Sequence, residues 1–91
     1  MLEKGFFVII TPTTQLMAES LESYNGAPFV INEMATNLNV PWHRSRVAVT
    51  KLIDLGLLEI AEQSWTGFTF YRKTKTFKSK LKQLRKENIL T

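Results

Sequence analysis

The chain has 91 residues, of which 44% are hydrophobic and 22% are charged, which is typical of one small globular domain. It has no cysteine and one histidine, His43, which excludes a disulfide framework, thiolate metal sites and thiol nucleophiles. The longest apolar run, residues 6–10, is far shorter than the ~20 residues of a membrane-spanning helix, and no secretory signal precedes it. We therefore expect a cytoplasmic protein from a bacterial, archaeal or viral system, with no metal, cofactor or small-molecule substrate.

Positive charge is concentrated in two segments. Residues 1–71 carry four basic side chains against seven acidic ones, whereas residues 72–91 carry eight basic side chains against Glu87 alone. Three of the four cations in the first part, Arg44, Arg46 and Lys51, lie close together. Such a pattern indicates a polyanionic partner, either nucleic acid or an anionic membrane, although a lysine-rich tail can also be merely solvated.

The first half of the chain predicts a strand and two helices. The β-branched and aromatic residues 6–10 favour a strand covered on both faces. Residues 13–24 predict a helix with Met17, Leu21 and Tyr24 on one face, ended by Asn25-Gly26. Residues 31–38 predict a second, short helix with an apolar stripe, and the chain breaks after it because Pro41 forces the residue before it out of the helical region.

The second half predicts a longer helix, a hairpin and a last helix. Residues 43–55 are expected to form the longer helix, which ends at Gly56. Its predicted inward positions are Ser45, Ala48, Val49, Leu52 and Leu55. Alternation in residues 57–62 and 68–72, around a glycine-containing turn, predicts a β-hairpin. Residues 76–90 predict a basic helix with one apolar stripe, formed by Phe77, Leu81 and Leu84 with Asn88 at the next position.

Two segments resemble a known family. Ile31-Asn32-Glu33-Met34-Ala35-x-x-Leu38-x-Val40 looks like the second helix and turn of a helix-turn-helix, and Leu52-x-x-Leu55-Gly56-Leu57-Leu58 looks like a recognition helix entering a wing. Over residues 13–73 the chain resembles the winged helix-turn-helix DNA-binding domain of MarR- and ArsR-type regulators. The resemblance implies a mainly α fold with a small β-hairpin (α+β), in which residues 1–91 form one domain and residues 74–91 add a basic helix.

The outward face of helix 43–55 holds the predicted base contacts. With the inward set buried, the side chains left to read the major groove are those of His43, Arg44, Arg46, Val47 and Thr50. Arginine pairs bidentately with guanine, and valine or threonine contacts the thymine methyl group. The alternative is a solvated helix face without a ligand.

A second set of polar residues is predicted to contact the DNA backbone. It comprises Lys51, Asn32, Thr36, Arg72, Lys73 and Lys75. The hairpin tip departs from the family, because Glu62 and Gln63 flank it where a DNA-binding wing has basic residues. Trp65 at this tip folds back on the hairpin, stacks on a sugar or base, or anchors a protein partner.

The apolar stripe of the last helix has two possible partners. Phe77, Leu81 and Leu84 either pair with the same helix of a second chain, with Asn88 setting the register, or pack on the body of their own chain. A homodimer is expected, because two-fold symmetric DNA sites double the contact of one recognition helix.

The sequence thus predicts a DNA-binding transcriptional regulator that occludes a promoter or a replication origin as a homodimer. The alternative is a winged-helix protein–protein interaction module in a transcription or replication complex, which the exposed Trp65 and the acidic wing flank favour. Enzymatic activity is not expected, because the carboxylates are scattered and no glycine-rich phosphate loop is present.

Overall fold

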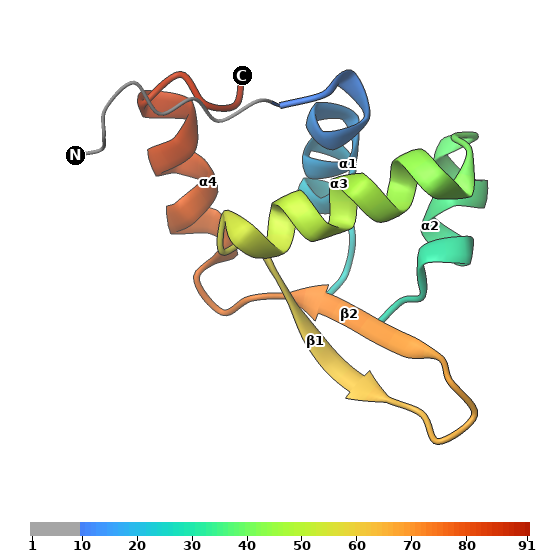
Figure 1. The fold of residues 1–91 in the computed structure, drawn as a ribbon. Coiled ribbons are helices and arrows are strands. Elements are labelled where there is room, and N and C mark those ends of the chain that lie inside the picture. The colour runs from blue at the N-terminus through green and yellow to red at the C-terminus, as the bar shows by residue number, and fades with distance from the viewer. Residues whose placement is uncertain (1–9) are drawn as a thin grey trace.

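The computed structural model describes residues 10–91, and these residues fold into four helices and one hairpin (Figure 1). The helices α1 (Pro12–Ser23), α2 (Ile31–Leu38) and α3 (Trp42–Asp54) come first. The strands β1 (Leu58–Gln63) and β2 (Thr69–Lys73) follow, and α4 (Phe77–Lys86) comes last. The predicted mainly α fold with a small hairpin is confirmed, whereas the predicted strand 6–10 lies outside the described residues except for Ile10, which is in no strand.

The boundaries of α1 follow from local capping chemistry. The Thr11 side chain accepts a hydrogen bond of 3.1 Å from the Thr14 backbone N–H, and Pro12 occupies the first turn, where its missing N–H leaves no bond unmade. The helix therefore starts one residue before the predicted position and ends at Ser23, one residue before the predicted end.

The turn between α2 and α3 depends on a left-handed residue. Asn39 has φ 55° and ψ 48°, a conformation that asparagine tolerates better than most residues. The Val40 N–H then donates to the Ala35 carbonyl oxygen at 3.0 Å, and Pro41 precedes the first residue of α3. This tight connection sets the angle at which α3 leaves α2.

A second left-handed residue joins α3 to the hairpin. Gly56 has φ +81°, and the Leu57 N–H donates to the Leu52 carbonyl oxygen at 2.9 Å, which is the hydrogen-bond pattern of a glycine-terminated helix. A Cβ atom at Gly56 would lie 3.2 Å from the Lys80 Cε atom of α4, so the Lys80 side chain reaches across to this turn.

The hairpin is a two-stranded antiparallel sheet with one irregularity. Its register shifts between Ile60 and Glu62, so the strand bends at this bulge. Phe29 extends the sheet beside β2, because its N–H and carbonyl exchange two hydrogen bonds of 2.8 Å with Tyr71. The hairpin is thereby tied to the segment that enters α2.

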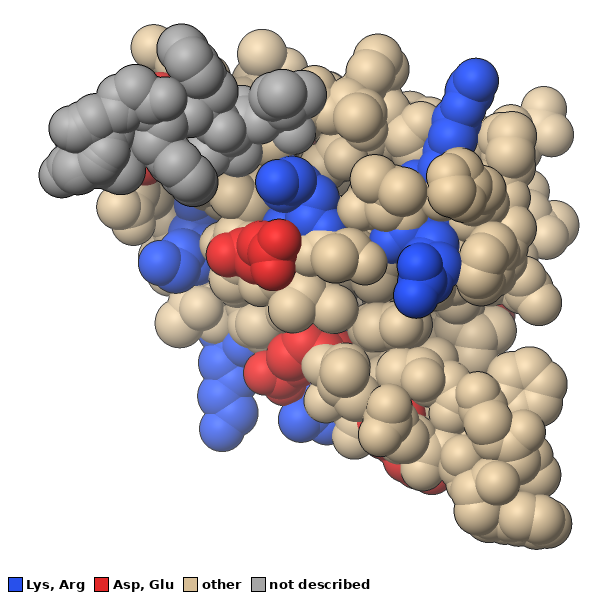
Figure 2. Space-filling model, in the orientation of Figure 1, with Lys and Arg blue, Asp and Glu red and all other residues tan. Residues whose placement is uncertain are grey.

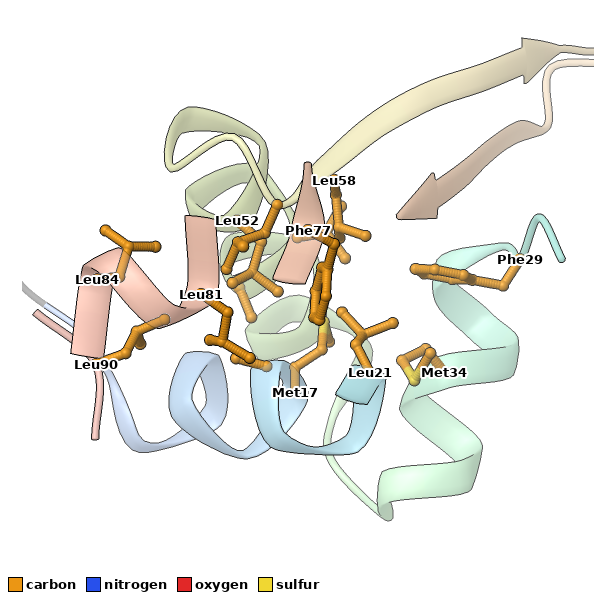
Figure 3. Packing of buried hydrophobic residues seen from close by; sticks show 14 of the residues in the cluster. Met17, Leu21, Phe29, Met34, Leu52, Leu58, Phe77, Leu81, Leu84 and Leu90 are labelled. Atoms are coloured by element: carbon orange, nitrogen blue, oxygen red, sulfur yellow. The ribbon is translucent and has the colours of Figure 1, made fainter. Parts of the chain in front are cut away.

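One hydrophobic core holds all four helices together. Met17 and Leu21 of α1, and Ala48 and Leu52 of α3, are fully buried. In Figure 3, Phe77 and Leu81 point from α4 toward α1, in the middle of this core. Phe77, Leu81 and Leu84 are only 4%, 4% and 7% exposed, so the apolar stripe of α4 packs on its own chain and their assignment as dimer contacts is withdrawn.

The last helix is shorter than predicted. It ends at Lys86, and Asn88 has φ +62°, so the chain turns back there and buries Leu90 against the core. Asn88 is exposed and lies beyond the helix. Its predicted role as a buried register residue is therefore wrong.

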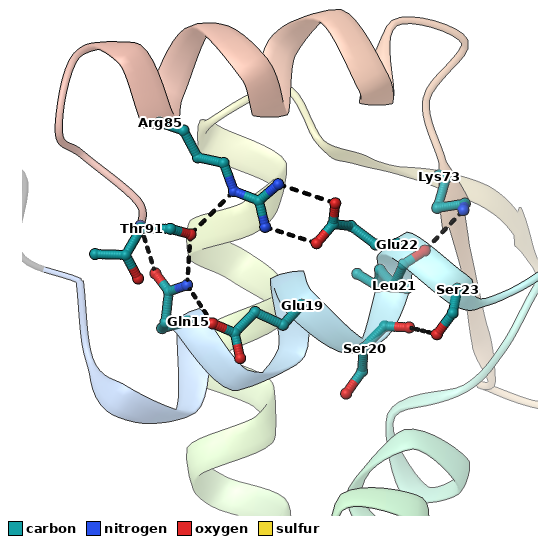
Figure 4. Close-up of polar contacts among 9 residues, drawn as sticks. All are labelled: Gln15, Glu19, Ser20, Leu21, Glu22, Ser23, Lys73, Arg85 and Thr91. Atoms are coloured by element: carbon teal, nitrogen blue, oxygen red, sulfur yellow. Dashed lines mark hydrogen bonds and ion pairs between the residues drawn. The ribbon is translucent and has the colours of Figure 1, made fainter.

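Polar contacts fasten α4 to α1 at the surface (Figure 4). The Arg85 guanidinium donates two hydrogen bonds to the Glu22 carboxylate, at 2.9 and 2.6 Å. This contact lowers the pKa of the Glu22 carboxyl and raises the pKa of Arg85. The Gln15 amide exchanges hydrogen bonds with the Thr91 backbone on the same side of the molecule. The docking of α4 against α1 thus combines a buried apolar stripe with a polar clasp.

Candidate nucleic-acid interface

Helix α3 has one buried face and one exposed face. Ser45, Ala48, Val49 and Leu52 are at most 1% exposed, which confirms these four inward positions, whereas Leu55 is half-buried against the core. The outward side chains are all exposed: His43, Arg44, Arg46, Val47 and Thr50. We call these five residues the α3 face. A 13-residue helix is about 20 Å long, which suits the major groove of DNA.

The α3 face carries two positive charges that no carboxylate of residues 10–91 neutralises in an ion pair. Within residues 10–91 the ion pairs join Arg72 to Glu59 and Arg85 to Glu22, and neither Arg44 nor Arg46 takes part in one. Figure 2 shows blue side chains along the length of α3, which crosses the molecule in this view. Two exposed guanidinium groups that have no carboxylate partner among residues 10–91 are available to bind an anion.

Val47 and Thr50 add methyl groups to the α3 face. Val47 is 45% exposed, and the Thr50 hydroxyl already donates to the Arg46 carbonyl oxygen at 3.0 Å. A groove of about 480 Å³ separates this face from the start of α1 and is lined by His43, Arg44 and Val47 on the α3 side. The face therefore offers two guanidinium groups and two methyl-bearing side chains beside an open groove.

The residues predicted to contact the DNA backbone lie in different environments. Asn32 and Thr36 are exposed on α2, and both line a shallow groove in front of the helix-turn-helix turn. Lys51 is half-buried on the next turn of α3. Asn32 shares a second groove with Arg46 of the α3 face, and Lys51 directly follows Thr50 of that face.

Three cations, two at the end of β2 and one just after it, are less alike than their spacing implies. Lys75 is exposed, and Arg72 is engaged with Glu59 at 2.7 Å. The Lys73 ammonium donates to the Leu21 and Tyr24 carbonyl oxygens, at 2.7 and 2.8 Å, and so caps the end of α1. Lys73 is therefore withdrawn from the backbone set, because its charge is committed to the fold.

The hairpin tip exposes a large aromatic side chain. Trp65 is 96% exposed, so the predicted alternative of folding back on the hairpin is wrong. The turn is ordered by its own polar groups, because the Ser64 N–H donates to the Phe68 carbonyl oxygen at 2.7 Å and Gly67 has φ +97°. In Figure 2 the tip, at the lower right, is largely free of charged side chains.

Two exposed aromatic residues were not predicted as part of the site. Trp42 is 48% exposed and Phe68 is 57% exposed, and both line a groove between the start of α3 and the hairpin. From the sequence, Trp42 at this turn is expected to be a core or staple residue rather than a DNA contact. The exposed position follows from its place as the first residue of α3, ahead of the buried Ser45.

Within the described residues, no helix has both the length and the hydrophobicity needed to cross a membrane. Residues 10–91 also hold no group of three or more metal-ligating side chains.

No family model and no curated protein matches the sequence. Solved structures do match. The adhesin competence repressor AdcR of Streptococcus pyogenes is 15% identical, with a TM-score of 0.59 over 87% of this chain and 57% of that chain. ZitR of Lactococcus lactis is 15% identical, with a TM-score of 0.59 over 94% of this chain and 58% of that one.

A third match is close to this chain in length. A candidate DNA-binding protein from Ralstonia eutropha JMP134 is 22% identical, with a TM-score of 0.58 over 84% of this chain and 98% of that one. The chain thus spans less than two thirds of the AdcR and ZitR chains but nearly all of this shorter one. Together with the element order, these matches show that the chain has the winged helix-turn-helix fold.

Proposed function

We propose that the chain is a DNA-binding transcriptional regulator whose α3 face enters the major groove. The observation that carries the proposal is the pair of exposed guanidinium groups, Arg44 and Arg46, unpaired among residues 10–91 on the recognition helix of a winged helix-turn-helix fold. AdcR, described as a repressor, and the candidate DNA-binding protein share this fold, which favours the same role here.

Each group on the α3 face suits one kind of contact. Arg44 and Arg46 present planar donors that match the O6 and N7 acceptors of guanine. Val47 and the methyl group of Thr50 fit thymine methyl groups, and His43 at the start of the helix lies where recognition helices meet base edges. Lys51, Asn32, Thr36, Arg72 and Lys75 supply the contacts to phosphate.

We also propose that the regulator acts as a homodimer on a two-fold symmetric site. One α3 face spans few base pairs, and a second copy doubles the contact. The apolar stripe of α4 is buried in its own chain, so the dimer contact must lie elsewhere. A symmetric sequence recovered from a pool of random duplexes, together with the mass of the complex, tests this part of the proposal.

The decisive experiment compares two double variants with the same loss of charge. Arg44→Ala/Arg46→Ala alters the α3 face, whereas Lys82→Ala/Lys86→Ala removes two exposed cations from α4. On the selected duplex each arginine substitution should cost about 1–3 kcal/mol of binding free energy and relax base preference. The lysine pair should at most weaken all sequences alike. The assignment of the α3 face would be refuted if the arginine variant and the lysine variant lost the same binding free energy, both on the selected duplex and on a random duplex.

The salt dependence gives an independent measure. If about six phosphates are neutralised, log K should fall with log salt at a slope near −5. Fluorescence anisotropy over a salt series measures this slope for the unchanged chain and for both variants.

A protein–protein interaction module is the second candidate function, because the hairpin exposes apolar residues. Trp65 is 96% exposed and Ile60 is 52% exposed, and the cation-poor tip is flanked by Glu62. Large exposed apolar surface often marks a site where a protein partner binds. No gel shift with mixed duplex DNA at ~50 mM salt would favour this function, since electrostatic binding should appear there.

A further inference from the structure

A groove between the start of α3 and the hairpin shares Asn32 and Arg46 with the proposed duplex interface, but its aromatic walls have no part in that interface. Its volume is about 340 Å³, and its lining includes Asn32, Trp42, Arg46, Phe68, Thr69 and Tyr71. Pockets of roughly this size, lined by aromatic groups with a few polar ones, are typical of small-ligand sites. The hairpin tip supplies one wall and the helix-turn-helix supplies the other.

The walls of the groove are unusually rich in exposed aromatic surface. Trp42 and Phe68 are 48% and 57% exposed, although both are large enough to favour burial. Arg46 lies with its guanidinium carbon 6.0 Å from the centroid of the Trp42 ring, at the outer limit of a cation–π contact. The guanidinium is therefore held near the groove without being fixed by a carboxylate of the described residues.

The positive charge of Arg46 in the groove favours an anionic ligand. Arg46 is its only ionised group among the described residues, and no Asp or Glu of residues 10–91 lines it. Asn32 and Thr69 add an amide and a hydroxyl, which can pair with the edge of a heterocycle. Aromatic faces beside a cation and an amide match a nucleobase with its phosphate.

We propose that this groove binds an unpaired nucleobase of single-stranded or locally melted DNA. A base inside a duplex has both faces stacked on its neighbours and cannot offer one to Trp42 or Phe68, whereas an unpaired base can. Arg46 contacts the adjoining phosphate, and Asn32 the base edge. The chain would then favour duplexes that contain an open segment over fully paired ones.

The chain carries its own spectroscopic probe of this site. Its two tryptophans are Trp42, in the groove, and Trp65, at the hairpin tip, so Trp65→Phe leaves Trp42 as the only tryptophan. Titrating this variant with an oligothymidylate of about 12 nucleotides at low salt should quench Trp42 emission as bases stack on the ring. Fully paired duplex of the same length should quench it much less.

Two matched substitutions test the groove within that background. Phe68→Ala removes an aromatic wall, whereas Ile60→Ala removes a similarly exposed apolar side chain, 52% against 57%, that does not line the groove. Phe68→Ala should weaken oligothymidylate binding by about 5- to 150-fold, the effect of losing one stacked base. Ile60→Ala should leave it unchanged, and thermal melting verifies that both variants are folded.

The outcomes separate this inference from the proposed function. Arg44 does not line the groove, so Arg44→Ala should weaken duplex binding while the quenching amplitude with oligothymidylate persists. If the unsubstituted chain binds no duplex DNA but oligothymidylate still quenches Trp42, the groove assignment stands and the proposed role as a duplex-binding regulator fails. Unquenched Trp42, or equal effects of Phe68→Ala and Ile60→Ala, would overturn the inference and leave the groove to a protein partner.

Discussion

Replacing Ser45 by alanine should stabilise the protein, although the position is completely buried. The Ser45 side chain is 0% exposed on the inward face of α3, and its hydroxyl oxygen has no hydrogen-bond partner among the described residues. Burying a hydroxyl without a partner carries a desolvation penalty of about 1–3 kcal/mol. Alanine removes that group and leaves almost the same volume.

The magnitude can be worked out from two contributions. Alanine is also a better helix former than serine, by about 0.5 kcal/mol. The sum predicts an increase of about 2 kcal/mol in the free energy of unfolding, to which the unmade hydrogen bond contributes most. For a domain of this size, that corresponds to a Tm higher by about 8–16 °C.

The assay is urea unfolding followed by circular dichroism, with Ser79→Ala as the control. Ser79 is exposed on α4, so its replacement changes helix propensity without relieving a buried hydroxyl. Ser45→Ala should exceed the control by at least 1 kcal/mol, about the smallest expected desolvation penalty. A gain no larger than that of Ser79→Ala, or a loss of stability, would refute the reasoning about the buried hydroxyl.

Three further predictions concern other parts of the fold. Gly56→Ala should cost about 1–2 kcal/mol, because alanine is strained at φ +81°, whereas Gly26→Ala, at a position with open space, should be nearly neutral in the same unfolding assay. Lys73→Met should cost about 1–3 kcal/mol, because the carbonyl oxygens at the end of α1 lose a charged donor; an unchanged stability would contradict that capping role. Glu22→Gln should cost up to about 1 kcal/mol at pH 7, as expected for an exposed bidentate pair with Arg85. Because the pKa of Glu22 is lowered in the folded state, the stability difference between the two proteins is fully present above pH 4.5 and should vanish as the pH falls through the folded-state pKa. A stability difference that persists at pH 2 would contradict the ion-pair explanation.

Local signals predicted most of the fold. Helices α2 and α3 lie within one residue of their expected bounds. The apolar stripe defines each helix, and Asn39 and Gly56, both with positive φ, end α2 and α3; each of these signals depends on a few neighbouring residues. The division of α3 into a buried and an exposed face follows from the same periodicity. These predictions needed no knowledge of which elements touch.

Errors arose where distant parts of the chain meet. Lys73 looked like a free cation, but the carbonyl oxygens that it binds lie 52 and 49 residues earlier in the chain. The apolar stripe of α4 predicted burial without naming the partner, and α1 supplies it. Asn88 fits a helical pattern as well as a left-handed turn, and the burial of Leu90 selects the turn.

The most direct test of the α3 face is an NMR titration with duplex DNA. The chain has four arginines, and their side-chain Nε–H signals form an internal comparison. Arg44 and Arg46 lie on the α3 face, whereas Arg72 and Arg85 are held by carboxylates. We predict that the signals of Arg44 and Arg46, with the methyl signals of Val47, shift most at saturation and that the Arg85 signal stays in place. Shifts confined to α4 or to the hairpin, with Arg44 and Arg46 unmoved, would contradict the account.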